Sequence, residues 1–525
     1  MKKTLALLSI AFVAFASAGC GGGEAASDNA VYDEAVYQDN YYYGGDNSMA
    51  NDDAADDDYW SEPSPQVEPV EDYASDFDDV EIGGYFNTEY DNLSTFGIDV
   101  DTASYSRARN YIENGSLPPA DSVRVEEFVN YFDAGYPTPE DIAFGIYADG
   151  ARSPFHSPGT YLLRFGIQGY EVPEVLRKPV SLTFVIDISG SMSAPNKLEL
   201  VKDSLQLLVD RLNGDDTVGI VVYGSRAATV LKPTSGDQKT KIKRAIERLD
   251  TGGSTNAEEG LRMGYDLAHR VYQPGSVNRV ILASDGVANV GRTEASDLLR
   301  FIEDYANSGI TMTSMGFGMG TYNDPFMEEL ADKGDGTYAY IDNFDEAKRM
   351  FVDELTSTLQ MIARDAKIQV DFNSDVVAHY RLLGYENRDI ADQDFRNDNV
   401  DAGEIGAGHS VTALYEIQLE PRAQGRIATV QLRWENPDTF QVVEINGNFN
   451  TWDMVSDFSE TDPHYRLAVL ASQFAEILRK SPYSSELSIE DVLEYAYPLG
   501  RELEDDPDVD EFIWLLQEAS YLAEW

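Results

Sequence analysis

The chain has 525 residues, too many for one hydrophobic core, so we expect two or three domains. It carries 93 acidic and 39 basic residues, and its formal net charge of −54 at pH 7 excludes a general affinity for nucleic acid and for anionic membrane surfaces. The single cysteine, Cys20, excludes an intramolecular disulfide, and no stretch after it approaches the roughly 18 apolar residues of a membrane-spanning helix.

Residues 1–20 have the pattern of a bacterial export signal, in which two lysines precede the apolar segment 5–15. Residues 17–20, Ser-Ala-Gly-Cys, resemble a lipobox, whose cysteine is lipidated and becomes the new N-terminus. Residues 16–18, Ala-Ser-Ala, also fit ordinary secretory cleavage. Because the only cysteine lies where a lipobox requires it, we expect lipidation of Cys20 and attachment to a membrane of the cell envelope, facing the periplasm or the surface. A soluble periplasmic or secreted protein is the alternative.

Residues 21–90 contain no lysine or arginine and are rich in Asp, Glu, Tyr, Ser and Gly. Low hydrophobicity with high net charge is typical of disorder. The segment therefore predicts an acidic, self-repelling linker that holds the folded part away from a membrane.

Residues 91–177 predict a flanking region of mixed structure. Residues 96–101 alternate as in a strand, residues 103–114 and 123–132 fit short helices, and residues 161–167 fit another strand.

Strands and helices alternate regularly between residues 178 and 364. This alternation predicts an α/β domain with a doubly wound, mostly parallel sheet covered by helices on both faces. Ligands of such sheets bind beyond the carboxyl ends of the strands. The expected strands are 181–186, 217–223, 228–231, 279–283, 311–315 and 338–341, and the expected helices are 198–212, 239–249, 257–272, 294–307 and 345–363.

The pattern changes to short strands in residues 365–455 and to amphipathic helices in residues 456–525. We expect a sandwich-like, β-rich domain followed by a helical C-terminal region. Our hypothesis is that strands of residues 140–178 and 366–450 belong to one β-rich domain into which the α/β domain is inserted.

Five oxygen-bearing side chains are predicted to lie at one edge of the parallel sheet. Asp187, Ser189 and Ser191 follow one strand, Asp285 follows another, and Thr255 lies in a loop before a helix. Two carboxylates and three hydroxyls form an all-oxygen set that suits Mg²⁺, with Ca²⁺ and Mn²⁺ as alternatives. The other interpretation is that these are turn and capping residues of a domain that binds no metal.

This set resembles the von Willebrand factor type A (VWA) fold with a complete metal-ion-dependent adhesion site. The resemblance implies that Ser189 and Ser191 bind the ion directly, and that Thr255 does so when a partner is bound. It also implies that Asp187 and Asp285 act mainly through waters, and that one coordination position stays open for an Asp or Glu carboxylate of a protein ligand. The loops 224–227 and 317–324 are expected to supply specificity.

The resemblance extends beyond the α/β segment. Residues 98–106 and 124–127 are similar to the N-terminal region of a family of bacterial VWA lipoproteins, and residues 401–409 are similar to its C-terminal region. The likeness covers roughly residues 90–525 and implies architecture more than biology.

An exported binding module is the function that these patterns favour, and we expect no catalytic residues. The five histidines are scattered and form no His-Glu-x-x-His motif, although the composition alone does not exclude a hydrolase with a pair of carboxylates. A structural subunit of an envelope assembly that docks through its flanking domains is the alternative. Binding to nucleic acid is not expected.

Overall fold

The computed structural model describes residues 82–98, 100–140, 142–286, 292–318, 324–353, 359–400 and 402–523. All of them belong to one compact unit of the chain, residues 71–525. The predicted export signal, Cys20 and most of the predicted acidic linker lie outside the described residues. Within the described part of the chain, no helix has the length and hydropathy needed to cross a membrane.

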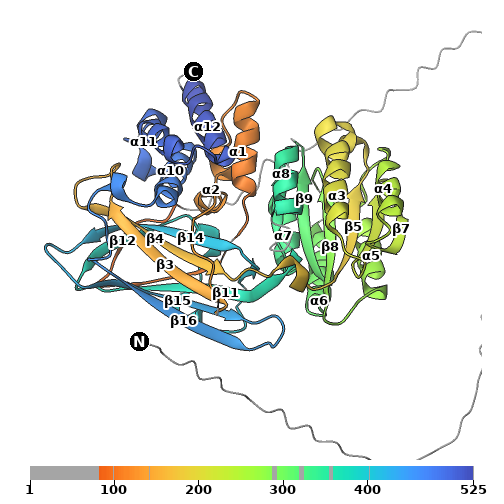
Figure 1. Cartoon of the computed structure of the whole chain (residues 1–525), viewed down its shortest axis with the longest axis horizontal. Coiled ribbons are helices and arrows are strands. Elements are labelled where there is room, and N and C mark those ends of the chain that lie inside the picture. Colours follow the sequence, from red (N-terminus) through yellow and green to blue (C-terminus); the bar gives the residue numbers. More distant parts are fainter. Residues whose placement is uncertain are drawn as a thin grey trace, which may run out of the picture. The chain divides into compact units, whose positions relative to one another are not determined.

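The α/β segment forms a six-stranded sheet in the order β10-β9-β8-β5-β6-β7 (Figure 1). Neighbouring strands are parallel except for the edge strand β7, which is antiparallel to β6. This arrangement confirms the expected mostly parallel sheet. The strands are β5 (Val180–Asp187), β6 (Thr217–Tyr223), β7 (Ala227–Ser235), β8 (Val277–Ser284), β9 (Thr311–Phe317) and β10 (Tyr338–Ile341).

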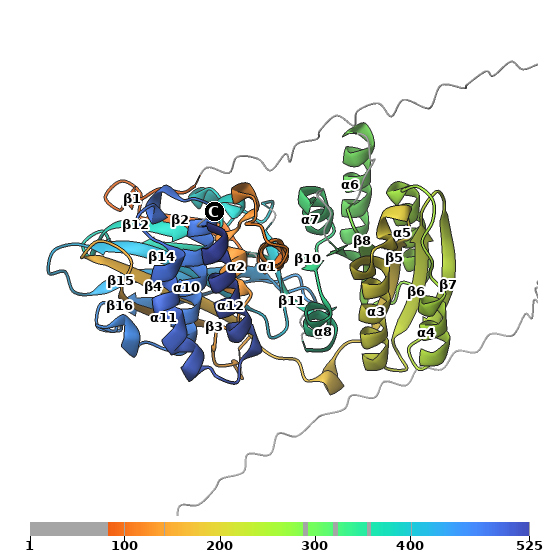
Figure 2. The same cartoon turned by 90° about the horizontal axis from the view of Figure 1, so that it is seen from above.

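Helices cover both faces of this sheet because its central strands are apolar on both sides (Figure 2). Phe184 and Ile186 of β5 face one core, whereas Val185 between them faces the other. The first core contains residues of α3 (Leu200–Arg211), α4 (Lys239–Glu247) and α8 (Phe344–Lys348). The second contains residues of α5 (Ala257–Arg270), α6 (Arg292–Ala306) and α7 (Asp324–Lys333).

The predicted helix 345–363 extends too far at its C-terminal end, and its residues 354–358 lie outside the described residues. Helix α8 continues as a wider helical turn, Arg349–Asp353, and the chain is already in strand β11 (Met361–Phe372) at residue 361. Residues 362 and 363 are buried against other strands of the β-rich part, so strand pairing decides the structure over helical periodicity. Helix α7 begins inside the segment that was expected to be a rim loop.

The β-rich part consists of two sheets that share one apolar core. Strand β4, before the α/β segment, pairs along its length with β14, after it. This pairing confirms that strands of residues 140–178 and 366–450 belong together. Strand β1 lies within the stretch assigned to the linker, so the ordered chain begins before residue 91. One sheet contains β1 (Phe86–Asn87), β12 (Val377–Leu383), β14 (Ser410–Leu419), β4 (Thr160–Gly169) and β3 (Phe144–Arg152); the other contains β13 (Gly403–Gly406), β11, β15 (Arg426–Glu435) and β16 (Val442–Asn450), with β2 (Leu93–Gly97) paired to β11.

A layer of helices packs on the outer face of the first sheet (Figure 1). Its core joins Phe128, Phe474 and Phe512 to Leu414 of the sheet, and these residues are nearly inaccessible to solvent. The helical C-terminal region is therefore confirmed. The layer contains α1 (Ala103–Glu113), α2 (Val125–Asn130), α10 (Pro463–Leu478), α11 (Ile489–Glu502) and α12 (Pro507–Ala523).

Buried charges also join this layer to the sheet. Arg381 of β12 donates to Glu416 of β14 at 2.9 Å and to Glu476 of α10 at 3.0 Å. Arg479 pairs with Glu476 and, at 2.9 Å, with Glu386. We name these five residues the Arg381 cluster.

Candidate metal centre

The predicted site lies where the parallel strands β5 and β8 end side by side. Asp187 is the last residue of β5 and is inaccessible to solvent. The register pairs Ile186 with Ala283, so the residues that follow each strand meet at the same edge. The Ser284 hydroxyl donates to Asp187 Oδ2 at 3.1 Å and thereby links the two strand ends.

Four of the five predicted residues are joined by their own polar atoms. The Ser189 N–H donates to Asp187 Oδ1 at 2.7 Å, which folds the chain back after the strand. The Ser189 and Ser191 hydroxyls are 2.9 Å apart, and Ser191 Oγ donates to Asp285 Oδ1 at 3.1 Å. Ser189 is buried and Ser191 is exposed, so this row of oxygens runs from the sheet edge to solvent.

The loop that carries Thr255 lies beside the site. The Gly190 N–H donates to the Gly253 carbonyl at 3.1 Å, and the Gly252 N–H donates to the Ile188 carbonyl at 2.7 Å. Gly253 has a φ of +90°, and a Cβ there would lie 2.5 Å from Ser225 Oγ, so a larger residue would push the Thr255 loop away from the loop that carries Ser225. Backbone hydrogen bonds therefore place the Thr255 loop beside the turn that carries Ser189.

Helix α5, which follows Thr255, lies unusually close to the sheet. Asn256 caps the helix by accepting from the Glu259 N–H. A Cβ on Gly260 would lie 2.7 Å from the Tyr223 ring, and a Cβ on Gly264 would lie 2.3 Å from Val185 Cγ2. These two glycines permit the close packing that holds the Thr255 loop at the sheet edge.

Lys197 enters the site from the turn after Ser191. Its ammonium lies 2.7 Å from Asp285 Oδ2, and both side chains are largely buried. Lys197 packs beneath the loop after β9, where a Cβ on Gly318 would lie 2.4 Å from its Cγ. The site therefore contains two carboxylates and one cation, so the negative charge is only partly neutralised.

The two carboxylates differ in their surroundings. Burial raises the pKa of Asp187, while hydrogen bonds from Ser189 and Ser284 oppose that effect. Asp285 presents one oxygen to Ser191 and the other to Lys197. The polar row thus combines a shielded carboxylate with one that faces a cation.

The oxygens of the row fit a hexacoordinate ion. Ligands at about 2.1 Å from Mg²⁺ in an octahedron lie about 3.0 Å from their neighbours, and the observed separations are 2.9 Å and 3.1 Å. Among the residues that the structure describes, no group of three or more His, Cys, Asp or Glu side chains offers an alternative metal site. Hydroxyl and carboxylate oxygens favour Mg²⁺ over softer metals.

Sequence reasoning missed Ser284 and Lys197. Ser284 directly precedes Asp285, and the parallel register of β5 and β8 was the signal that could have placed it beside Asp187. Lys197 carries no such signal, because its position depends on the packing of the loop after β9. Of the two expected rim loops, 224–227 contacts the Thr255 loop through Ser225, and residues 319–323 of the other lie outside the described residues.

Three segments of the chain match known families. Residues 181–357 match the von Willebrand factor type A domain, and residues 71–164 match a family described as von Willebrand factor. Residues 357–522 match the C-terminal region of the uncharacterized protein YfbK.

Two curated relatives show how far the likeness extends. The uncharacterized protein YfbK of Escherichia coli (strain K12) is 35% identical over 433 residues, which cover 77% of this chain and 74% of that protein. The uncharacterized protein sll0103 of Synechocystis is 27% identical over 273 residues, covering 50% of this chain and 64% of that protein. Among solved structures, a von Willebrand factor type A protein from Catenulispora acidiphila aligns with 71% of this chain and 89% of its own, at 14% identity and a TM-score of 0.42.

Proposed function

This chain belongs to the family of YfbK and combines a VWA domain with a YfbK-type C-terminal region, and we propose that it binds a protein partner through a divalent metal ion. The ion is held at the edge where β5 and β8 end. A carboxylate from an Asp or Glu side chain of the partner completes its coordination. The chain is a binding module and has no catalytic residue.

The observation that carries this proposal is the pair of Ser189 and Ser191 hydroxyls, spaced for adjacent corners of an octahedron, with the Asp285 carboxylate next to Ser191. Ser189 and Ser191 would bind Mg²⁺ directly, and Thr255 would join them when the partner is bound. Asp187 and Asp285 would hold the waters of the ion. When bound, Mg²⁺ supplies a Lewis-acidic centre that attracts an anionic ligand. Ca²⁺ and Mn²⁺ are the competing ions.

Charge balance supports an anionic partner. The site contributes two carboxylates, and Lys197 neutralises part of Asp285. The net charge of the protein groups is therefore smaller than the charge of a divalent ion. Since the uncompensated charge lies next to exposed Ser191, an external carboxylate is the ligand that neutralises it.

The setting that we propose is the bacterial cell envelope. Lipidation of Cys20 would anchor the chain in a membrane, and the acidic residues 21–81 would separate the folded part from it. This arrangement would present the metal edge to partners in the periplasm or at the surface.

The direct test has two parts, both made with the exported full chain. Isothermal titration with MgCl₂ should give one saturable site in the wild type and none in Asp187→Ala or in Ser189→Ala/Ser191→Ala. Ser193→Ala, an exposed serine in the same turn, is the matched control and should bind as the wild type does.

The second part is a pull-down from envelope extract in Mg²⁺ or in EDTA. Capture of a protein only by the wild type and only with Mg²⁺ is the expected result. Equal capture by the wild type, by Asp187→Ala and in EDTA would refute metal-dependent binding. It would assign partner binding to the flanking sheets and helices, as in a structural subunit of an envelope assembly.

A further inference from the structure

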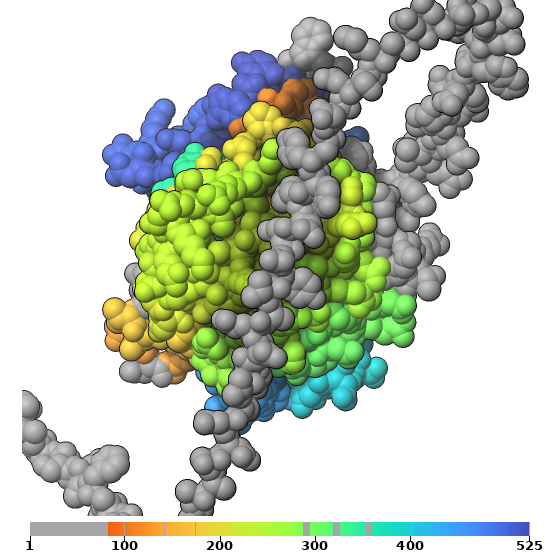
Figure 3. Space-filling view, turned by 90° about the vertical axis from the view of Figure 1, so that its right-hand side faces the viewer, coloured from red at the N-terminus to blue at the C-terminus, as the bar shows by residue number. Residues whose placement is uncertain are grey.

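A basic segment stands out in this acidic chain. Residues 226–248 contain seven lysines and arginines and only two acidic residues, whereas the whole chain carries a net charge of −54. The segment comprises strand β7 and helix α4, on the side of the molecule that Figure 3 turns toward the viewer. Such a concentration of positive charge marks a surface for an anionic partner.

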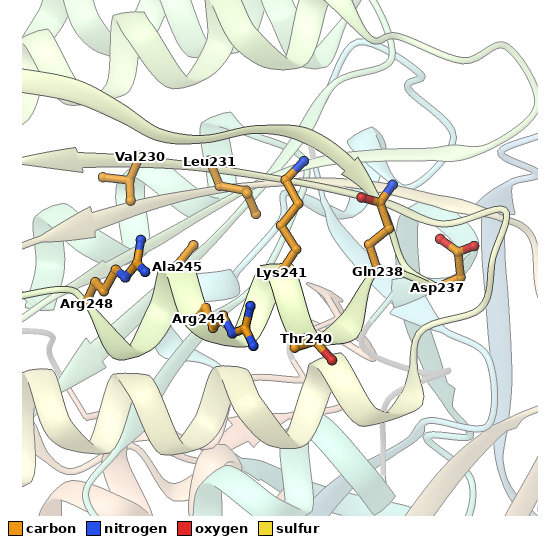
Figure 4. A pocket seen from close by; sticks show the side chains of 9 residues that line it. All are labelled: Val230, Leu231, Asp237, Gln238, Thr240, Lys241, Arg244, Ala245 and Arg248. Atoms are coloured by element: carbon orange, nitrogen blue, oxygen red, sulfur yellow. The ribbon is translucent and has the colours of Figure 1, made fainter.

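A groove of about 620 Å³ lies between β7 and α4. Figure 4 shows Lys241 and Ala245 of the helix rising toward Val230 and Leu231 of the strand, with Arg244 and Arg248 along the helix. Val230 is 41% exposed, so the floor of the groove offers apolar surface and its rim offers cations. This combination fits a segment that alternates apolar and acidic side chains.

The basic residues of the groove differ in their partners. Lys239 donates to the Asp210 carbonyl at 2.6 Å and Lys243 pairs with the Asp210 carboxylate at 2.7 Å, so both are bound to α3. Lys241, Arg244 and Arg248 are exposed, and none of them forms an ion pair with another described residue. Three cations therefore remain available to a ligand in the groove.

Strand β7 is the edge of its sheet, and within the described part of the chain only β6 pairs with it. An edge strand offers unpaired backbone N–H and C=O groups to another extended chain. Lys232 discourages pairing with a second copy, because two β7 edges side by side would bring like charges together. The same charges attract an acidic strand.

We propose that the β7–α4 groove binds an extended, acidic peptide segment of a partner protein. The segment adds to the outer edge of β7 through backbone hydrogen bonds and places its carboxylates against Lys241, Arg244 and Arg248. Nucleic acid is a poor occupant, because the field of the whole chain repels a long polyanion. Binding in the groove needs no metal ion, so it can be tested separately from the metal-dependent function proposed above.

The groove is also close to the metal edge along the chain. Strand β6 ends at Tyr223 beside the site, and β7 begins at Ala227 after a short loop whose Ser225 accepts from the Ser254 N–H at 3.0 Å. A partner segment along β7 would therefore start next to the Thr255 loop. One partner protein can contact both sites.

The test is fluorescence anisotropy with the full chain, in EDTA and at low salt. The probe is a fluorescein-labelled octapeptide of alternating Val and Glu, and the matched probe replaces every Glu by Gln. Tighter binding of the Glu peptide, by about tenfold or more, is expected, and the difference should shrink in 0.5 M NaCl because salt screens exposed charges. Equal binding of the two peptides would overturn the proposal.

Matched variants separate the groove from the total charge. Arg244→Glu/Arg248→Glu should weaken binding of the Glu peptide at least tenfold, whereas Arg270→Glu/Arg300→Glu, which changes the net charge equally at exposed sites on α5 and α6, should change it less than about twofold. Equal losses in both variants would refute a specific groove. Arg244→Gln/Arg248→Gln is the milder variant, and its melting temperature shows that the fold is intact.

Two further probes identify the occupant. A Val-Glu peptide N-methylated at alternate residues along one edge should bind about tenfold more weakly, because it cannot pair with β7 along that edge. Unchanged binding would overturn strand addition. Anionic phosphatidylglycerol vesicles that bind the groove more tightly than the peptide does would also overturn the proposal, in favour of a lipid-headgroup site.

Discussion

The metal edge holds two carboxylates and the Arg381 cluster holds three, and the two regions differ in how many of these carboxylates contact a cation. In the cluster, the guanidinium of Arg381 bridges Glu416 and Glu476, and Arg479 adds a second cation. Burial acts to raise the pKa of Glu416, but a hydrogen bond from His156 and the charge of Arg381 hold it down to about 2. At the metal edge the Lys197 ammonium contacts Asp285, whereas the largest effect on Asp187 is burial, which raises its pKa.

This difference in the contacts of the carboxylates distinguishes a structural cluster from a ligand-binding site. In the Arg381 cluster each carboxylate contacts a guanidinium, and such pairs serve the fold, because removing one partner leaves a costly unpaired charge. Carboxylates that are only partly compensated, and that lie next to exposed hydroxyls, are ready for an external cation. We therefore expect mutations in the Arg381 cluster to lower the stability of the fold and mutations at the metal edge to lower the affinity for a ligand.

The largest effect is expected in the cluster. Replacing Arg381 by Met leaves Glu416 and Glu476 with one cation fewer, and we expect the free energy of unfolding to fall by about 3–5 kcal/mol. Urea unfolding measures this loss. The control is Arg396→Met, whose exposed ion pair with Glu444 should contribute about 1 kcal/mol or less. Equal losses in the two variants would contradict the comparison.

His409, which is partly buried, extends the comparison to a base without a carboxylate partner. Burial lowers the pKa of His409 to about 4 from its ordinary value of 6.5. As the pH falls from 6.5 to 4, His409 becomes protonated in the unfolded chain but stays neutral in the folded chain. The free energy of unfolding therefore falls by about 3 kcal/mol over this window. Urea midpoints from pH 7 to pH 4 should fall less steeply in His409→Gln than in the wild type. In His269→Gln, at an exposed position, the slope should be retained.

Removal of Mg²⁺ should affect the metal edge and not the Arg381 cluster. At a Mg²⁺ concentration of 100 times its Kd, the wild type should gain about 2.7 kcal/mol of stability relative to EDTA. Asp187→Asn should lose this gain, while its stability in EDTA should stay within about 1 kcal/mol of the wild type, because burial already disfavours the charged form. Urea unfolding with and without Mg²⁺ measures both quantities. A large loss in EDTA would assign Asp187 to the fold.

The smallest effect sharpens the role of Lys197. Replacing it by Met removes a positive charge near the ion, so we expect Mg²⁺ affinity to rise about tenfold, or about 1.4 kcal/mol, and affinity for the acidic partner to fall. Isothermal titration measures the first change. A fall in Mg²⁺ affinity would show that Lys197 chiefly positions Asp285. Lys202→Met, whose lysine pairs with Glu199 away from the site, is the control.

Sequence reasoning found the sheet and most of the candidate site because both follow local patterns. The alternation of strands and helices predicts the sheet, and the ends of β5 and β8 must then share an edge. The Arg381 cluster could not be found in this way, since Arg381 lies 35 residues from Glu416 and 95 from Glu476. Residues 361–363, the end of the predicted helix 345–363, are strand for a similar reason, because β11 is defined by partners far along the chain.

The pairing of β4 with β14 sets the order in which the chain can fold during synthesis. Ser410, opposite Gln168, is made about 240 residues later, which at ribosomal rates of about 5–20 residues per second is roughly 12–50 s. During that interval the β3–β4 hairpin has an open edge. The VWA domain can fold while it waits, and the chain returns beside its point of exit, since Gly408 donates to the Tyr170 carbonyl and Ala407 to the Gln360 carbonyl. A folded insertion thereby shortens the effective loop that β14 must close.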